Sequence, residues 1–448
     1  MLKVMCTILM VYSFLYSSPV AADELDLVAL NQADTAWILV ATALVLLMTL
    51  PGLALFYAGL VRTKNVLSVL IHCLLITCVT SVLWLVAGYS LAFGDANPFI
   101  GGLGGFMIAG MKAESLSGSI PEYLFFAFQM TFFIITPALI VGAFVERMKL
   151  SAMLIFVALW SVLVYAPVCH WVWGPNGFML DWGVKDLAGG IVVHITAGVA
   201  ALVACVMVGR RKGFPQRSFA PHNLPMCITG AALLWVGWFG FNAGSGLTAN
   251  GDAAQTLVVT HISASVATLV WSLIDWRQTG KVSALGAATG LIAGLAAITP
   301  ASGDVGPAGA LLIGAISAMV CRYASTTLKH RYAYDDSLDV VGVHGVGGLV
   351  GTLLVAIFAA ESFGGKGVIS IPGATSYSIV EQFSVQVVAS GITIAYTFFL
   401  TVGILLVTKA ICGGLRVSEE EEELGLDLTV HGEAGYVQAE TDSFIKAS

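Results

Sequence analysis

The chain of 448 residues has 58% hydrophobic side chains, only 10% charged ones, a formal net charge of −7 and a mean hydropathy of +0.89. A soluble globular domain carries about a quarter of its residues as charged ones, so this composition excludes an ordinary soluble protein. The sequence has no basic patch with interleaved aromatic residues, and we expect no nucleic-acid partner. Its eight cysteines are scattered without a CxxC pair, so we predict neither a disulfide framework nor a metal site.

The first 22 residues have the pattern of a secretory signal peptide. Lys3 supplies a positive start, an apolar run follows from Val4 to Tyr16, and Val20-Ala-Ala22 supplies small residues for cleavage. This run is shorter than the roughly 20 residues that a spanning helix needs. We therefore expect residues 1–22 to be removed, and an uncleaved first helix is the alternative.

About eleven apolar runs of membrane-spanning length follow along the chain. They are Thr35–Gly59, Val66–Phe93, Glu122–Val145, Ser151–Trp171, Ala188–Val208, Leu224–Phe241, Thr256–Ile274, Ser283–Ile298, Val305–Arg322, Leu338–Ala360 and Val385–Cys412. These runs predict an all-α polytopic membrane protein, with a transmembrane domain over residues 23–412 and a polar tail over residues 413–448.

The basic residues of the loops test this number of helices. One side of the membrane receives Arg62, Lys64, Arg147, Lys149, Arg210, Arg211, Lys212, Arg217, Arg277, Lys281, Arg322, Lys329, Arg331, Lys409, Arg416 and Lys446. The other side receives only Lys112, Lys185 and Lys366. Because the side rich in Lys and Arg is normally cytoplasmic, we expect the mature N-terminus outside and the tail inside.

The fifth and tenth predicted helices begin with similar segments. Asp186-Leu-Ala-Gly-Gly-Ile-Val-Val-His194 opens the fifth, and Asp336-Ser-Leu-Asp-Val-Val-Gly-Val-His344 opens the tenth. The predicted topology gives these two helices opposite directions, which is typical of inverted repeats with a functional site at their interface. We expect repeats over about 35–208 and 224–360, and a final helix over about 385–412 outside them.

The two histidines are expected near the middle of the membrane. Each follows its aspartate by eight residues, so each lies about 12 Å into a core of roughly 30 Å, from opposite sides. Abundant glycine beside both histidines permits close helix approach, which could bring the imidazoles into contact. Ionisable groups inside a membrane mark substrate or proton paths by default. A purely structural pair, bonded to backbone carbonyls, is the alternative.

The sequence also resembles the Amt/Mep/Rh ammonium transporters, and is most similar to bacterial AmtB-type members. The resemblance runs from about Asp34 to Tyr436. It is carried by Pro51-Gly-Leu-Ala-Leu-Phe-Tyr57, by the segment from Asp186 to His194, by Gly237-Trp-Phe-Gly-Phe-Asn-Ala-Gly-Ser245 and by Gly342-Val-His-Gly345.

The resemblance implies an external vestibule that recruits the ammonium ion. Trp173 and Ser245 are similar to the residues that bind the cation there, and Phe132 lies beside them. Asp186 resembles an acidic residue that supports this site without necessarily touching the substrate. The physical chemistry agrees, because aromatic faces attract cations and a hydroxyl oxygen accepts an N–H bond.

The resemblance also implies a pore below the vestibule. Phe132 and Phe241 are similar to two stacked rings that gate it, and His194 and His344 to the twin histidines that line it. The implied function is a channel-like transporter that takes up nitrogen as ammonium or ammonia, with methylammonium as an analogue, and conducts NH₃ with or without its proton. No enzymatic motif is present, and we expect neither catalysis nor a cofactor.

The tail has two possible interpretations. Ser418 with Glu421 three residues later predicts a capping box that opens a short helix. Composition alone favours a solvated tail, whereas the resemblance implies a tail packed on the cytoplasmic face of a homotrimer in the cell inner membrane. The resemblance further implies that the tail there helps to couple transport to a PII-type signal protein.

Two further functions remain open at this point. An ammonium sensor that transports little would share the same site. An electron-transfer protein with haem held between His194 and His344 would show an intense visible absorption band. A gas channel of the Rh type is a subdivision of the transport hypothesis.

Overall fold

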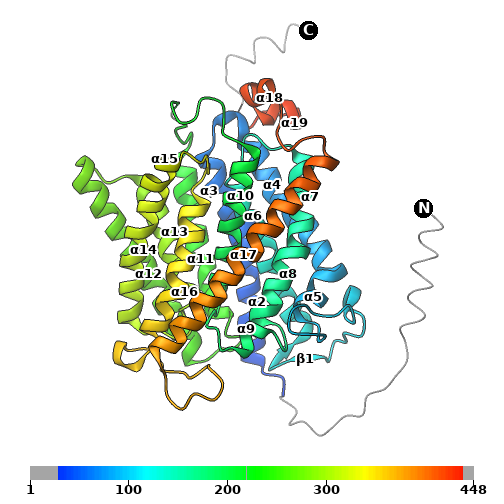
Figure 1. The fold of residues 1–448 in the computed structure, drawn as a ribbon, viewed down its shortest axis with the longest axis vertical. Coiled ribbons are helices and arrows are strands. Elements are labelled where there is room, and N and C mark those ends of the chain that lie inside the picture. Colours follow the sequence, from blue (N-terminus) through cyan, green and yellow to red (C-terminus); the bar gives the residue numbers. More distant parts are fainter. Residues whose placement is uncertain (1–28, 218, 437–448) are drawn as a thin grey trace, which may run out of the picture.

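The computed structural model describes residues 29–217 and 219–436, and the predicted signal peptide lies outside them. The described chain is a bundle of long helices that run between two loop-covered ends (Figure 1). The first half contains α2 (Gln32–Leu47), η1 (Met48–Leu53), α3 (Ala54–Leu60), η2 (Thr63–Asn65), α4 (Val66–Leu83), η3 (Trp84–Gly88), α5 (Tyr89–Phe93), η4 (Phe106–Ile108), β1 (Leu116–Ser117), β2 (Ile120–Pro121), α6 (Glu122–Val141), α7 (Leu150–Trp160), η5 (Ser161–Tyr165), α8 (Ala166–Trp173), α9 (Phe178–Asp181), η6 (Gly190–Ile195) and α10 (Thr196–Val208).

The second half repeats this helical organisation and is followed by one more long helix. It contains α11 (Leu224–Gly244), α12 (Gly251–Thr279), α13 (Ala284–Ile298), α14 (Pro307–Tyr323), η7 (Ala324–Leu328), α15 (Lys329–Tyr332), η8 (Val341–Gly345), α16 (Val346–Phe358) and η9 (Glu361–Phe363). The final elements are α17 (Ile379–Ile411), α18 (Glu419–Leu424) and α19 (Leu426–His431).

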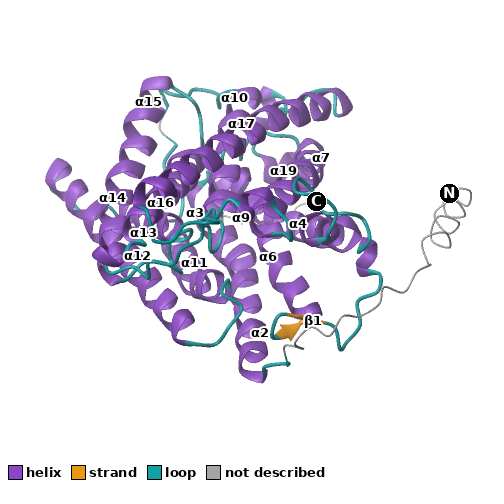
Figure 2. Cartoon of the chain, turned by 60° about the horizontal axis from the view of Figure 1, so that its bottom comes forward, coloured by secondary structure: helices purple, strands orange, loops and turns teal. Residues whose placement is uncertain are grey.

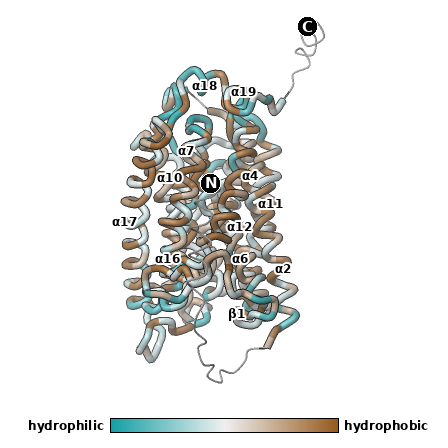
Figure 3. Tube along the Cα trace, turned by 90° about the vertical axis from the view of Figure 1, so that its right-hand side faces the viewer, coloured by the Kyte–Doolittle hydropathy of each residue, from teal (hydrophilic) through white to brown (hydrophobic). Residues whose placement is uncertain are grey.

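The helices have the length and apolarity of membrane spans. Within the described residues, 10 helices are long and apolar enough to cross a membrane. The remaining predicted span, Ser283–Ile298, is the shorter apolar helix α13. Outward-facing side chains such as Leu269 and Phe399 are each 69% exposed, which suits a lipid surround. Hydrophobic residues fill the middle of the bundle and hydrophilic ones collect at its ends (Figure 3). The predicted all-α polytopic membrane fold is confirmed.

Polar side chains begin many of these helices. Asn31, Asn223, Asn250, Ser283 and Ser378 accept backbone N–H bonds at the starts of α2, α11, α12, α13 and α17. Such caps satisfy N–H groups that the first helical turn leaves without partners. The helix ends are therefore set by local polar contacts as well as by hydropathy.

The fifth and tenth spans cross in opposite directions. Gly190 lies against Thr352, and Gly198 lies against Gly345. As the residue numbers rise along the fifth span, those of its partners in the tenth span fall. The π-helical start of each span packs on the α-helical part of the other. This antiparallel crossing is the arrangement that an inverted repeat predicts.

The two ends of the bundle differ. We call the end that carries α18 and α19 the tail face, and the opposite end, with β1, β2 and α9, the strand face (Figure 1). Figure 2 brings the strand face forward, with β1 near its edge and α9 over the middle. The helix α17 crosses the bundle diagonally between the two faces (Figure 1).

The described part of the tail is folded onto the bundle. Ser418 and Glu421 form the predicted capping box at the start of α18, which confirms that prediction. Asp427, 1% exposed, accepts from the backbone N–H groups of Leu67 and Ser68 at 3.0 and 2.8 Å. Glu422, also 1% exposed, accepts at 2.8 Å from the backbone N–H of Lys212. A solvated tail is therefore wrong for these two helices, because buried acidic side chains anchor both.

Candidate functional site

Two buried histidines meet in the centre of the bundle. His194 lies in η6 and His344 in η8, and they are 1% and 4% exposed. Their Nδ1 atoms are 3.4 Å apart, and their ring centroids are 5.3 Å apart with an interplanar angle of 30°. The prediction that the two imidazoles come into contact is confirmed.

Each histidine lies in a π-helical turn that follows an aspartate. The Asp186 carboxylate accepts from the backbone N–H groups of residues 189–192 at 2.5–3.2 Å. Asp336 likewise accepts from the N–H of Val341 at 2.8 Å. These carboxylates satisfy the unpaired donors of a helix start. The wider turn, in which the N–H of His194 bonds the carbonyl of Gly189, sets the direction of the imidazole.

A small apolar cavity adjoins the histidine pair. Its volume is about 10 Å³ and it is lined by Met48, Leu53, Phe56, Ile135, Leu139, Val193, His194, Leu234, Trp238, Phe241, Ile292 and His344. That volume is close to the minimum for one water-sized molecule. The Nε2 of His194 has no protein partner among the described residues, so it is free to bond such a molecule.

A chain of aromatic rings leads from the histidines toward the strand face. Trp238 and Phe241 stack on His194 at centroid distances of 5.6 and 6.2 Å. The ring centroids of Phe132 and Phe241 are 4.4 Å apart. The Phe132 ring also meets the Trp173 ring edge-on, with a centroid distance of 5.8 Å. Phe132 and Phe241 are each 1% exposed. These two rings separate the small cavity from the strand face.

A hollow of about 210 Å³ lies on the strand-face side of these rings. It is lined by Phe93, Phe125, Gln129, Phe132, Val172, Trp173, Leu180, Leu187, Ser245 and Leu247. The indole N–H of Trp173 donates to the backbone carbonyl of Asp186 at 2.7 Å, which fixes the ring. Ser245 donates its hydroxyl proton to the carbonyl of Phe241 at 2.7 Å, so its oxygen lone pairs remain available to accept.

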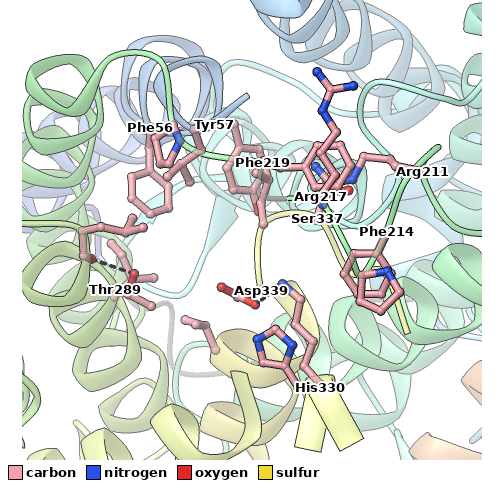
Figure 4. A pocket seen from close by; sticks show the side chains of 18 of the residues that line it. Phe56, Tyr57, Arg211, Phe214, Arg217, Phe219, Thr289, His330, Ser337 and Asp339 are labelled. Carbon is pink, nitrogen blue, oxygen red and sulfur yellow. Dashed lines mark hydrogen bonds and ion pairs between the residues drawn. The ribbon is translucent and has the colours of Figure 1, made fainter. Parts of the chain in front are cut away.

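A larger pocket of about 460 Å³ opens on the tail face. Phe56 and His344 line both this pocket and the small cavity, so the two hollows adjoin. Figure 4 shows Phe56 and Tyr57 on one side of the pocket and Arg211 and Phe214 on the other. A strand-face hollow, a small apolar cavity and a tail-face pocket therefore follow one another through the bundle.

Comparison with known proteins identifies the family. Residues 36–436 match the sequence model of the Ammonium Transporter Family. The chain belongs to this family. It is 46% identical to an ammonium transporter of Aquifex aeolicus over 413 residues, covering 91% of this chain and 94% of the relative. It is 43% identical to an ammonium transporter of Bacillus subtilis, covering 91% of this chain and 99% of the relative.

Solved structures of family members have the same fold. The structure of Saccharomyces cerevisiae Mep2 superposes with a TM-score of 0.81 at 35% identity and covers 92% of each chain. A protein described as Sensor Amt Protein superposes with a TM-score of 0.82 at 30% identity, covering 89% of this chain and 98% of that one. The predicted membership of the ammonium transporters is confirmed.

The structure places the predicted site residues of this family member along one path, except Asp186, which lies behind it. Trp173, Ser245 and Phe132 line the strand-face hollow, and Phe132 with Phe241 closes its inner end. Asp186 does not line the hollow, because its carboxylate is occupied with backbone N–H groups. Their roles in transport remain predictions.

Sequence reasoning missed two residues on this path. Trp238 stacks on His194, and Gln129 lines the strand-face hollow with a buried Oε1 that has no partner among the described residues. Trp238 is three residues before Phe241, a spacing that puts both on one helix face. Gln129 is likewise three residues before Phe132. The spacing from the two predicted phenylalanines could therefore have indicated both Trp238 and Gln129.

The geometry also bears on the haem alternative. The Nδ1 atoms of His194 and His344 are 3.4 Å apart, and the cavity beside them holds about 10 Å³. A macrocycle has no room between two imidazoles that already touch. The comparisons likewise favour transport, because the sequence relatives are described as ammonium transporters.

Proposed function

We propose that the protein conducts ammonium across a membrane by recruiting NH₄⁺ at the strand-face hollow and passing NH₃ along the histidine pair. One observation carries this proposal. The hollow, the Phe132–Phe241 pair, the cavity at His194 and the tail-face pocket form one series through the bundle. Membership of the Ammonium Transporter Family supplies the substrate.

Recruitment of the ion rests on the side chains of the hollow. An ammonium ion beside Trp173 and Phe132 gains cation–π attraction of about 0.5–1 kcal/mol when exposed and about 2 kcal/mol when desolvated. The oxygen of Ser245 accepts one of its N–H bonds, since the hydroxyl proton is already donated to Phe241. The hollow therefore favours a small cation that also donates hydrogen bonds.

Passage beyond the phenylalanine pair favours the neutral molecule. An apolar cavity makes a dehydrated ion costly, whereas NH₃ loses much less hydration there. The free Nε2 of His194 replaces one of the hydrogen bonds that ammonia had in water. The ion therefore gives up its proton before the cavity, and the proton either returns to the strand side or crosses separately.

We further propose that the tail face is cytoplasmic and the strand face external. Lys64 and Lys212 of the tail face contact Glu423 of the tail, and Lys149 lies near the carbonyl of Cys412. Basic residues thus surround the tail, as the positive-inside rule expects of a cytoplasmic surface. The proposal places the mature N-terminus outside and the C-terminus inside a bacterial-type inner membrane. The homotrimer and the PII-type partner remain predictions from the family resemblance.

Reconstituted liposomes test the transport proposal. An ammonium pulse is applied while membrane current and internal pH are recorded together for the wild type, His194→Ala and His344→Ala. Current that disappears in both variants means that net charge crosses with the help of the histidines. Internal alkalinisation without current means that only NH₃ crosses. If neither signal exceeds that of protein-free liposomes, the transport proposal is rejected and the sensor function gains support.

A further inference from the structure

The last long helix, α17, belongs to neither repeat, yet it contacts both. It packs against α7, η5, η6 and α10 of the first half and against α16 of the second. Figure 1 shows it crossing the bundle diagonally in front of these helices. A helix in this position can fix one half of the molecule relative to the other.

One side chain of α17 makes that connection close to the strand face. The amide of Gln386, 0% exposed, accepts at 2.9 Å from the backbone N–H of Lys185 and donates at 2.8 Å to the carbonyl of the same residue. It also donates at 3.0 Å to the carbonyl of Thr352 in α16. Gln382, one turn earlier, donates to its Oε1 at 3.3 Å. All four hydrogen-bonding positions of the Gln386 amide are thus occupied.

The residue that Gln386 holds directly precedes Asp186, whose backbone carbonyl is bonded to Trp173 of the recruitment site. Lys185 is followed by Asp186, whose carbonyl accepts from the indole of Trp173 and whose carboxylate caps the η6 turn that carries His194. The ammonium group of Lys185 is fixed independently by Asp304 at 2.6 Å. Backbone displacement at Lys185 would therefore move the Trp173 ring and the start of η6 together.

We propose that Gln386 is a positioning residue for the ammonium recruitment site, acting through the backbone of Lys185. This inference rests on the proposed function. Gln386 does not line the strand-face hollow, so it has no direct contact with a substrate there. Its two bonds to Lys185 form a clamp, because the Oε1 of Gln386 accepts from the N–H of this residue while the Nε2 donates to its carbonyl.

The Gln386→Met variant tests the proposal, because methionine keeps the side-chain length and removes every hydrogen bond. We expect the ammonium concentration for half-maximal transport to rise about tenfold, since the recruitment site loosens. The maximal rate should change less, by about twofold, because His194 at the far end of η6 keeps its own bond to the Gly189 carbonyl and its contact with His344. Ser390→Ala is the matched control. Ser390 lies one turn along the same helix, is 2% exposed and has no partner among the described residues.

Amide hydrogen exchange gives a second readout that does not need transport. Peptides covering residues 184–192 should exchange faster in Gln386→Met than in the wild type or in Ser390→Ala. In its protonated form, Gln386→Glu keeps an acceptor for the N–H of Lys185 and one donor for the carbonyls that the Gln386 Nε2 faces, so it should give intermediate values in both measurements. It also replaces the methionine variant if that protein does not purify as a folded species.

The outcomes separate this inference from the transport proposal. Wild-type liposomes without an ammonium signal would reject the transport proposal and, with it, the recruitment role of Gln386. A conducting wild type with an unchanged half-saturation concentration in Gln386→Met would overturn the inference alone. Faster exchange with an unchanged half-saturation concentration would also overturn it, because the clamp would then be structural only.

Discussion

Gly198 of α10 and Gly345 of η8 are in direct backbone contact, and a Cβ on Gly198 would lie 2.1 Å from the Cα of Gly345. Gly198 is also one turn after His194, so this contact sets how closely the two histidines approach. The distance between the imidazoles therefore depends on two residues that carry no side chain.

The Gly198→Ala variant should separate the two helices. We expect a loss of stability of about 1–3 kcal/mol from overpacking and a strong loss of transport, because the histidines move apart. Thermal unfolding in detergent and the liposome assay measure the two effects. Gly391→Ala in α17 is the control, since nothing lies within 4 Å of an added Cβ there. Normal transport by Gly198→Ala would show that contact between the imidazoles is unnecessary.

The Trp173→Leu variant should weaken recruitment and leave conduction intact. Loss of a desolvated cation–π contact raises the half-saturation concentration about tenfold, with little change in the maximal rate. Concentration series of ammonium-induced signals measure both quantities. Trp182→Leu is the control, because Trp182 is 41% exposed and lies outside the hollow. An equal shift in the two variants would mean that the hollow is not the recruitment site.

The two aspartates that precede the histidines should differ in importance. The Asp186 carboxylate accepts from four backbone N–H groups, whereas the Asp336 carboxylate accepts a hydrogen bond from the backbone N–H of Val341. In Asp186→Asn the new amide would face backbone donors, at a cost of about 1–3 kcal/mol for each unsatisfied group. We therefore expect lower thermal stability and less transport in Asp186→Asn than in Asp336→Asn. The reverse order would contradict the cap assignment.

The stability of the tail face should decrease at acid pH. Glu146 is 2% exposed and contacts Arg211 at 3.0 Å and Arg62 at 2.8 Å. Burial alone would raise the pKa of Glu146, but the charges of Arg211 and Arg62 outweigh it and hold this pKa below its ordinary value. A lowered carboxyl pKa contributes stability above the unfolded-state pKa of about 4.3. That contribution is lost as the pH falls through the lower, folded-state value.

Melting temperatures measured across acid pH test this assignment. The wild type should lose stability on acidification more steeply than Glu146→Gln, which has lost the titrating group. Glu433→Gln is the control, because Glu433 is an exposed tail residue. Parallel curves for the wild type and Glu146→Gln would show that this carboxylate does not contribute to the acid transition.

Anchoring of the tail should depend on Asp427. Its carboxylate accepts from the backbone N–H groups of Leu67 and Ser68 at the start of α4, so Asp427→Ala leaves these donors unpaired. We expect the 413–436 segment of this variant to be cleaved several-fold faster by a protease added at the tail face. Glu420→Ala is the comparison, since Glu420 is exposed on α18. Equal cleavage rates would mean that Asp427 does not anchor the tail.

The sequence predicted those features that depend on length, apolarity and repeat spacing. Spans such as Val66–Phe93 agree with the structure, and the equal spacing of Asp186–His194 and Asp336–His344 predicted the meeting of the histidines. Hydropathy did not predict the ends of those helices whose boundaries are set by polar contacts. Predicted as Thr256–Ile274, α12 extends over Gly251–Thr279, because Asn250 caps its start and Gly280 ends it with a positive φ of 75°.

Other features could not be predicted because they depend on contacts between distant segments. The π-helical turns at the histidines require a carboxylate placed to bond several backbone N–H groups at once. The clamp of Gln386 on Lys185 joins residues 201 positions apart. Nothing in the local sequence around Gln386 distinguishes it from other polar residues of a membrane helix.

The antiparallel crossing of the two repeats also bears on how the protein is made. His194 and His344 are 150 residues apart, and each half supplies only one of them. A chain that has inserted only its first half has neither a histidine pair nor the pocket that continues from it. On the proposed route, ammonia therefore cannot pass until the second half has folded against the first.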